Sequence, residues 1–163
     1  MKFQLTEIGN AERFVSLYGD QIKYCHQEHS WYVWDGVKWA QDENGAVNRF
    51  YLRMVRGLYD EANKAVLSGE RDVAIRWWKT SSTSRSIGAS LTIAKSLLDV
   101  AVSSNLFDKD AYSLNTHTGI IDLRTNVIKQ HKNQLLTHCC NTSFVQGEKC
   151  PKWLKFLDDI TAG

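Results

Sequence analysis

The feature that most constrains this fold is a long stretch of helical periodicity between residues 46 and 67. Apolar side chains recur there at every third or fourth position, from Tyr51 to Val66. The pattern continues for about six turns, which predicts one amphipathic helix with a single buried face. The pair Ser68-Gly69 follows and is expected to end it.

A β-hairpin is predicted before this helix, because Asp35-Gly36 lies between two aromatic-rich runs. Asp-Gly is a favoured pair in two-residue turns, where both central residues need a positive φ. Such a turn would pair Trp34 with Val37 and Tyr32 with Trp39.

The same register places Tyr32, Trp34 and Trp39 on one face of the hairpin. Their apolar alternation predicts core positions. The alternative is a stacking platform for unpaired bases, as in single-strand binding proteins. Trp31 lies on the opposite face and is the better candidate for an exposed aromatic side chain.

The other elements follow from capping residues and short apolar runs. We expect a short helix capped by Asn10 and ending at Gly19, a helix at 70–80, a third helix capped by Ser84 or Ser86 with apolar residues up to Ala101, and a final helix at 152–160. We expect strands at 22–25, 31–34 and 37–40, and again at 112–115, 120–123 and 127–130. Helices between two small β parts favour an α+β class over a parallel βαβ sheet. The prediction is one domain, 1–163, with central helices flanked by two small antiparallel β-hairpin units.

The second β unit has its own turn signal, Thr125-Asn126. Asparagine tolerates a positive φ, so these two residues can connect neighbouring strands. In that register Asp122 faces Lys129, which predicts an ion pair across the strands.

Composition describes an ordinary globular chain. It has 163 residues, of which 43% are hydrophobic and 23% charged, and a net charge of +2. This balance neither demands nor excludes a nucleic-acid partner. The first residues include no long apolar segment typical of a signal peptide, and no apolar run is long enough to span a membrane. We therefore expect a cytoplasmic protein without a membrane partner.

The cysteine spacing fits a reducing compartment. The four cysteines, Cys25, Cys139, Cys140 and Cys150, form no CxxC pair. A zinc site could be assembled from Cys25, His26 and His29 with later cysteines. Two adjacent cysteines cannot easily face one metal, so no metal or other cofactor is expected.

No catalytic motif is found in the sequence. A phosphate-binding Walker loop and a nucleophile elbow are both lacking. Metal-dependent phosphoryl transfer needs clustered carboxylates. Asp108 and Asp110 have no obvious third partner, and Asp158-Asp159 point to different sides of a helix. These acids are interpreted as surface charges, and the chain alone is not expected to be an enzyme.

One candidate for nucleic-acid binding lies on the long helix. Arg49, Arg53 and Arg56 are spaced at i, i+4 and i+7, away from the apolar face. Guanidinium groups suit bidentate contact with phosphate. The alternative is a solvated helix face, or one in which Asp60 pairs with Arg56.

A second candidate is Arg76, Lys79 and Arg85, which surround the hydroxyl-rich connector at residues 80–84. Hydroxyls, unpaired backbone N–H groups and a helix N-terminus together favour anion binding. The alternative is a plain loop whose serines cap the next helix. The sequence leaves both open.

Several short motifs, taken in order, resemble one kind of replication protein. They are the run from Thr6 to Phe14, Trp34-Asp-Gly-x-x-Trp39, Leu114-Asn115-x-x-x-Gly119-x-x-Asp122-Leu123-x-Thr125, His131, and Cys150-Pro151-x-Trp153-Leu-x-Phe156-Leu157. This succession is similar to the N-terminal helicase-associated domain of phage, plasmid and poxvirus-type primase–helicases of helicase superfamily 3. The sequence has Thr118 and Asn126 where that family usually has asparagine and glycine.

The resemblance implies an accessory domain of a replicative DNA helicase, with the ATPase expected after residue 163. Its implied partners are single-stranded or forked DNA, the ATPase domain, other subunits of a helicase oligomer, and a primase. Three hypotheses remain. A DNA-engaging domain requires converging basic residues, an oligomerisation or docking module requires an exposed apolar patch, and a free-standing enzyme requires a cluster of catalytic side chains.

Overall fold

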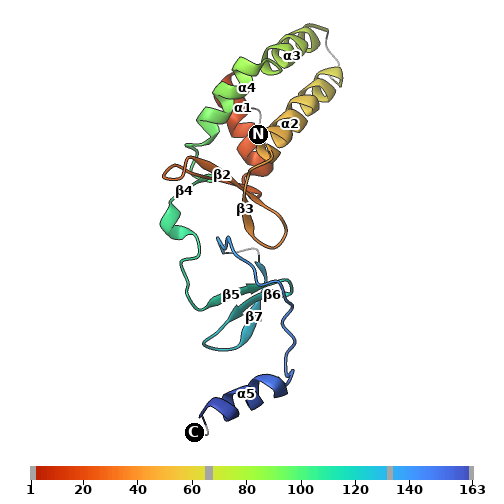
Figure 1. The fold of residues 1–163 in the computed structure, drawn as a ribbon. Helices are drawn as coiled ribbons and strands as arrows, with labels where there is room; N and C mark the ends of the chain where they lie inside the picture. The colour runs from red at the N-terminus through yellow and green to blue at the C-terminus, as the bar shows by residue number, and fades with distance from the viewer. Residues whose placement is uncertain (1–2, 65–67, 132–133, 162–163) are drawn as a thin grey trace.

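The structure is a computed structural model that describes residues 3–64, 68–131 and 134–161 (Figure 1). Its helices are α1 (Glu7–Tyr18), α2 (Ala46–Asn63), α3 (Ser68–Ser81), α4 (Ser84–Ala94) and α5 (Pro151–Thr161), with a short 3-10 helix, η1, at Ser104–Leu106. The strands are β1 (Ile22–Cys25), β2 (Ser30–Trp34), β3 (Trp39–Gln41), β4 (Ala101–Val102), β5 (Ser113–Thr116), β6 (Gly119–Asp122) and β7 (Val127–Lys129). The α+β prediction is confirmed.

Helix α1 begins earlier than the sequence predicted. Thr6 is its N-cap, and its hydroxyl accepts a hydrogen bond from the N–H of Gly9 at 3.1 Å. Asn10, the predicted cap, is instead buried inside the helix, 1% exposed. The prediction was wrong because Thr6, one turn upstream, is also a competent capping residue.

Helices α2 and α3 form the long antiparallel hairpin at the top of Figure 1. Gly45 is the N-cap of α2, and the two carboxylate oxygens of Asp42 accept from the N–H groups of Ala46 and Val47 at 2.7 and 3.0 Å. One face of α2 is buried, as the periodicity predicted. The helix ends at Asn63, and the predicted continuation at 65–67 lies outside the described residues.

Helix α4 packs against α1 and is capped by Thr83, not by either predicted serine. The hydroxyl of Thr83 accepts from the N–H of Ser86 at 3.3 Å. The helix ends at Ala94, before the predicted Ala101. The chain turns there because the carbonyl of Leu97 accepts from both Val100 and Ala101.

The first sheet has the order β3-β2-β1-β4 and lies beneath the helices (Figure 1). Strand β4 pairs with β1 in parallel, through Tyr24↔Ala101 and Cys25↔Val102. The prediction of a purely antiparallel hairpin unit was incomplete here. Parallel strands need a long crossover connection, and helices α2 to α4 supply it.

The β2–β3 turn is longer than predicted. Trp34 pairs with Trp39, so the loop has four residues, Asp35–Lys38. The Asp35 carboxylate accepts from the N–H groups of Val37 and Lys38, both at 2.8 Å. These side-chain bonds close an Asx-type turn, which displaced the expected two-residue turn. Gly36 still has a positive φ, +105°.

The two-residue shift in register changes the cross-strand partners but keeps the aromatic residues on the faces that were predicted. Trp31 faces the helices and packs against Tyr24, with ring centroids 5.0 Å apart. The prediction that Trp31 is the exposed aromatic was therefore wrong. Tyr32, Trp34 and Trp39 lie on the other face of the sheet.

That other face is covered by later parts of the chain. Tyr32 contacts Phe107, with centroids 4.5 Å apart, and Trp34 lies 6.3 Å from the ring of His131. Trp39 is 6% exposed, and its backbone N–H donates to the backbone carbonyl of Leu136 at 2.8 Å. These contacts favour the core interpretation over a free stacking platform.

The second sheet is antiparallel, with the order β5-β6-β7. Asp122 is opposite Val127, so the register is two residues from the predicted one. The predicted ion pair nevertheless forms diagonally, with Lys129 Nζ 3.1 Å from Asp122 Oδ2. Asn126 has the expected positive φ, +54°.

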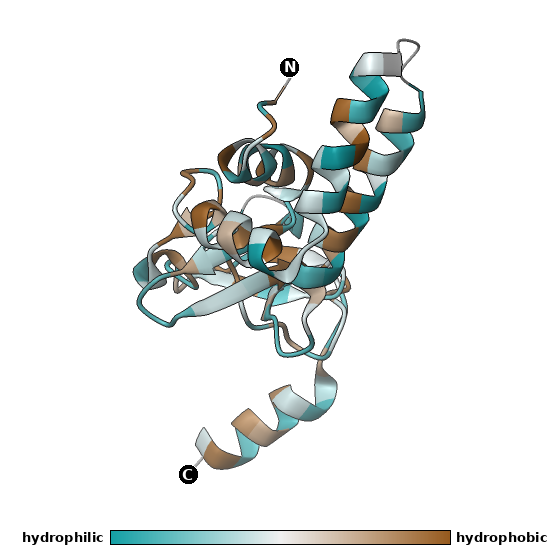
Figure 2. Ribbon diagram, turned by 90° about the horizontal axis from the view of Figure 1, so that it is seen from above, coloured by the Kyte–Doolittle hydropathy of each residue, from teal (hydrophilic) through white to brown (hydrophobic). Residues whose placement is uncertain are grey.

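The layers follow one another along the molecule: helices α1–α4, the first sheet, the second sheet and then α5 (Figure 1). The core of the upper part lies between the first sheet and helices α1, α2 and α4. Helix α5 stands apart from both sheets in both views (Figures 1 and 2). No described helix is long and apolar enough to cross a bilayer.

Candidate nucleic-acid interface

The three arginines predicted on the long helix all lie on the exposed face of α2. Arg49 at its start donates two hydrogen bonds to Asn44, both at 2.6 Å, to the carbonyl and to the side-chain oxygen. Arg53 lies over the ring of Phe50, 5.9 Å from its centroid. Neither contact neutralises the positive charge.

The predicted alternative pairing with Asp60 does not form. Among the residues that the structure describes, Arg49, Arg53 and Arg56 make no ion pair with a carboxylate. Arg13 of α1, by contrast, donates two hydrogen bonds to the Glu61 carboxylate, at 2.8 and 2.9 Å, so its charge is paired within the molecule. The stripe on α2 therefore presents charge to solvent.

Helix α3 brings two more predicted cations to the same hairpin. Arg76 and Lys79 are exposed on α3. The two helices are joined by Tyr59 of α2 and Trp78 of α3, whose ring centroids are 4.7 Å apart at 49°. Arg56 is one turn before Tyr59, and Lys79 follows Trp78, so each aromatic ring has a cation close to it in sequence.

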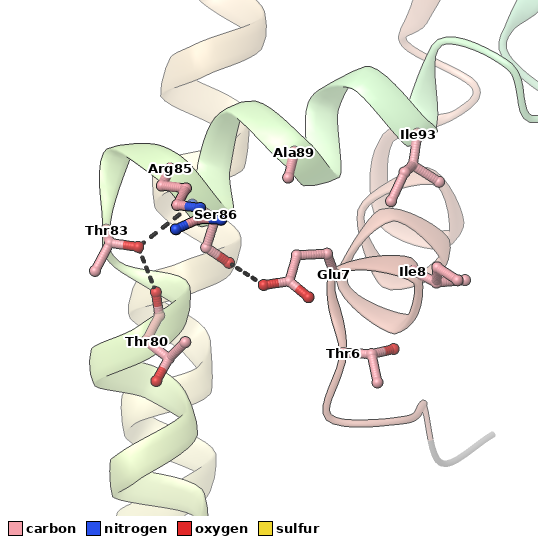
Figure 3. A pocket seen from close by; sticks show the side chains of 9 residues that line it. All are labelled: Thr6, Glu7, Ile8, Thr80, Thr83, Arg85, Ser86, Ala89 and Ile93. Atoms are coloured by element: carbon pink, nitrogen blue, oxygen red, sulfur yellow. Dashed lines mark hydrogen bonds between the residues drawn. The ribbon is translucent and has the colours of Figure 1, made fainter.

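The connector between α3 and α4 borders a hollow of about 610 Å³ (Figure 3). Arg85 lines it, together with Thr6, Glu7, Thr83 and Ser86. The N-termini of α1 and α4 both reach this hollow, as the capping residues Thr6 and Thr83 show.

The polar groups of the hollow already have partners. The Thr83 hydroxyl donates to the carbonyl of Thr80 at 2.8 Å and caps α4 (Figure 3). The Ser86 hydroxyl donates to the Glu7 carboxylate at 3.4 Å. Glu7 places a negative charge in the hollow that also contains Arg85, so the geometry favours the capping alternative.

The carboxylates of the second sheet form a structural cluster. Hydrogen bonds from Arg124 and then from Lys129 hold the pKa of Asp122 far below its ordinary value. The N–H of Tyr112 and the hydroxyl of Ser113 lower the pKa of Asp110. Asp108 accepts from the N–H of Thr137 at 2.9 Å. These carboxylates therefore accept hydrogen bonds that hold the loops and strands of this region together.

The cysteines and histidines are dispersed. Cys25 is buried and donates to the side chain of Gln27 at 3.4 Å. Burial raises the pKa of the Cys139 thiol. Within the described ranges, no group of three His, Cys, Asp or Glu side chains is placed to hold a metal ion.

Two features were missed at the level of sequence. The Tyr59–Trp78 pair depends on how two helices cross, which periodicity alone does not fix. Glu7 enters the hollow because α1 begins at Glu7, and the incorrect cap at Asn10 concealed this. The first-turn position of an acid after Thr6 was the available signal.

A family comparison matches most of the chain. The family model described as "D5 N terminal like" matches residues 11–162. A search of the curated proteins found no match. The matched region contains most of α1, helices α2 to α5 and both sheets. The chain therefore belongs to the D5 N terminal like family, the N-terminal domain of D5-like phage and poxvirus primase-helicases.

Proposed function

We propose that this chain is an accessory domain of a replicative DNA helicase and contacts DNA through the α2–α3 hairpin. The main support is the row of Arg49, Arg53 and Arg56 on the exposed face of α2, none of which forms an ion pair with a carboxylate among the described residues. A helical row rises 1.5 Å per residue, so the three side chains are distributed over about 10 Å. Successive phosphates of one strand can meet such a row.

The neighbouring helix supports a single-stranded or forked substrate. Arg76 and Lys79 add positive charge on α3, and the Tyr59 side chain is 42% exposed beside Trp78. Bases of a single strand stack on exposed aromatic rings, while cations track the backbone. Arg85 is the weakest member of the proposed interface, because Glu7 lies in the same hollow.

Fluorescence anisotropy of labelled single-stranded, duplex and forked DNA tests the proposal. We expect the triple variant Arg49→Ala, Arg53→Ala, Arg56→Ala to lose affinity for all three DNAs at low salt. The matched control is Lys109→Ala, Lys149→Ala, Lys155→Ala, which removes the same charge from exposed positions outside the hairpin. Equal affinity of both triple variants would contradict the role of α2.

A second role, assembly of a helicase oligomer or docking of a primase, is supported by a separate observation. Helix α5 exposes four large apolar side chains, Trp153, Leu154, Phe156 and Ile160. Exposed apolar patches mark interaction surfaces. In this proposal an ATPase domain follows this domain in the parent polypeptide, and the protein acts in the cytoplasm.

A further inference from the structure

Helix α5 is amphipathic and lacks a packing partner among the described residues. Trp153, Phe156, Leu157 and Ile160 follow the i, i+3, i+4, i+7 spacing of one helix face. Trp153 is 55% and Ile160 59% exposed. Figure 2 shows hydrophobic segments along α5, which stands separate from the rest of the molecule.

Helix α5 is too short to be more than marginally stable by itself. It has 11 residues, and helices this short are marginal in water without tertiary packing. Its charges also oppose the helix dipole, because Lys152 and Lys155 lie in the first half and Asp158 and Asp159 in the second. Stabilisation has to come from a surface that covers the apolar face.

A matching apolar groove lies at the other end of the molecule. A hollow of about 450 Å³ is bordered by α1, α2, α3 and the residues before α1. Its lining includes Leu5, Leu58, Val73 and Trp77. Leu5 is 45% and Val73 44% exposed, so the groove presents apolar surface to solvent.

The charges at the groove and at α5 are complementary. Glu70 lines the groove and forms no ion pair among the described residues, whereas Glu61 is held by Arg13. On α5, Lys152 borders the apolar face next to Phe156 in the helical projection. An amphipathic helix whose apolar anchors enter a groove with an opposite charge at its edge is a recurrent recognition mode.

We infer that α5 of one molecule docks into the α1–α2–α3 groove of a second copy. The occupant comes from another copy because groove and helix lie at opposite ends of the layered molecule, with both sheets between them (Figure 1). The contact is heterologous, so each copy offers one helix and one groove, and repetition gives a ring or an open chain. This inference rests on the proposed assembly role and gives it a site.

Analytical ultracentrifugation over a concentration series tests the inference. The wild-type chain should associate beyond the mass of one copy. Phe156→Asp on the helix and Val73→Glu in the groove should each abolish that association. The control is Leu98→Asp, a residue that is 95% exposed away from both surfaces, and it should associate as the wild type does.

Mixing the two defective variants gives the sharper result. The Phe156→Asp chain keeps its groove and the Val73→Glu chain keeps its helix, so the mixture should form one-to-one pairs and nothing larger. A monomeric wild type, association unchanged by either substitution, or a mixture that stays monomeric would each overturn the inference. Circular dichroism of each variant confirms that it is folded.

DNA affinity measured on the same samples separates the two proposals. The Phe156→Asp variant leaves all the cations of the α2–α3 hairpin in place, so its single-site affinity for a short single strand should remain within about twofold of wild type. If the wild-type chain binds DNA but stays monomeric, only the self-docking inference is overturned. If the wild-type chain self-associates but does not bind DNA, only the proposed DNA contact is overturned.

Discussion

The side chain of Asn10 donates a hydrogen bond to the hydroxyl of Ser81 at 2.9 Å and so connects α1 to the last residue of α3. Its carbonyl oxygen accepts from the indole N–H of Trp77 at 3.3 Å. Asn10 and Ser81 are both fully buried, at 1% and 0% exposed. One amide therefore satisfies two polar groups of the neighbouring helix in the interior.

Asn10→Ala should destabilise the fold by about 1–3 kcal/mol, because it leaves a buried hydroxyl without its partner. Urea denaturation measures the change in the free energy of unfolding. Asn48→Ala, an exposed substitution on α2, should change it by less than about 0.5 kcal/mol. Equal effects at the two positions would show that the Asn10 contacts contribute nothing.

The helices were largely predictable, because 3.6-residue periodicity directly reflects a buried face. The buried positions of α2, such as Tyr51, Met54 and Leu58, are those the pattern indicated. Helix starts were harder to locate. Thr6, Asn10, Thr83 and neighbouring serines are all competent caps, and tertiary packing decided among them.

Strand register was less predictable. A carboxylate at Asp35 that binds two backbone N–H groups changes a two-residue turn into a four-residue loop. That change paired Trp34 with Trp39 in place of Val37. The face of Trp31 was predicted correctly, but its burial was not, because the sequence does not show that the helices cover that face. The two-residue strand β4 could not be found from sequence, since its parallel pairing with β1 depends on the whole intervening helical crossover.

The candidate interface was predictable only one helix at a time. The spacing of Arg49, Arg53 and Arg56 correctly placed them on one exposed face. Their relation to α3 depends on the Tyr59–Trp78 contact, which has no local sequence signal. The docking groove is likewise a product of three helices that meet in space.

Gly9→Ala should be strongly destabilising. A Cβ at this position would lie 2.0 Å from the backbone oxygen of Gln4, closer than any real contact, so the segment before α1 would have to move. Gly57→Ala on α2 is the matched control, because its Cβ would meet nothing within 4 Å. Alanine there should stabilise α2 by about 0.5–1 kcal/mol. Thermal unfolding of the two variants should shift in opposite directions.

Asp122→Asn should alter the dependence of stability on acid. The pKa of Asp122 is lowered in the folded state, first by Arg124 and then by Lys129. Its stabilisation is therefore fully present above the unfolded pKa of about 3.9 and is lost as pH falls toward the lower folded value. The variant should be less stable at neutral pH and lose less stability on acidification.

Urea unfolding at several pH values between about 6 and 2 measures this effect. The control is Asp159→Asn, which changes an exposed carboxylate without an ion pair among the described residues. It should retain the wild-type pH dependence. Identical curves for Asp122→Asn and wild type would contradict the assigned ion cluster.

The salt dependence of single-stranded DNA binding tests the central claim most directly. Each phosphate contact contributes about 0.7 to the slope of log Kobs against log salt for a single strand. Replacing Arg49, Arg53 and Arg56 by alanine should therefore reduce the magnitude of the slope by about 2. An unchanged slope, or an affinity in the wild type that does not respond to salt, would contradict a DNA contact on α2.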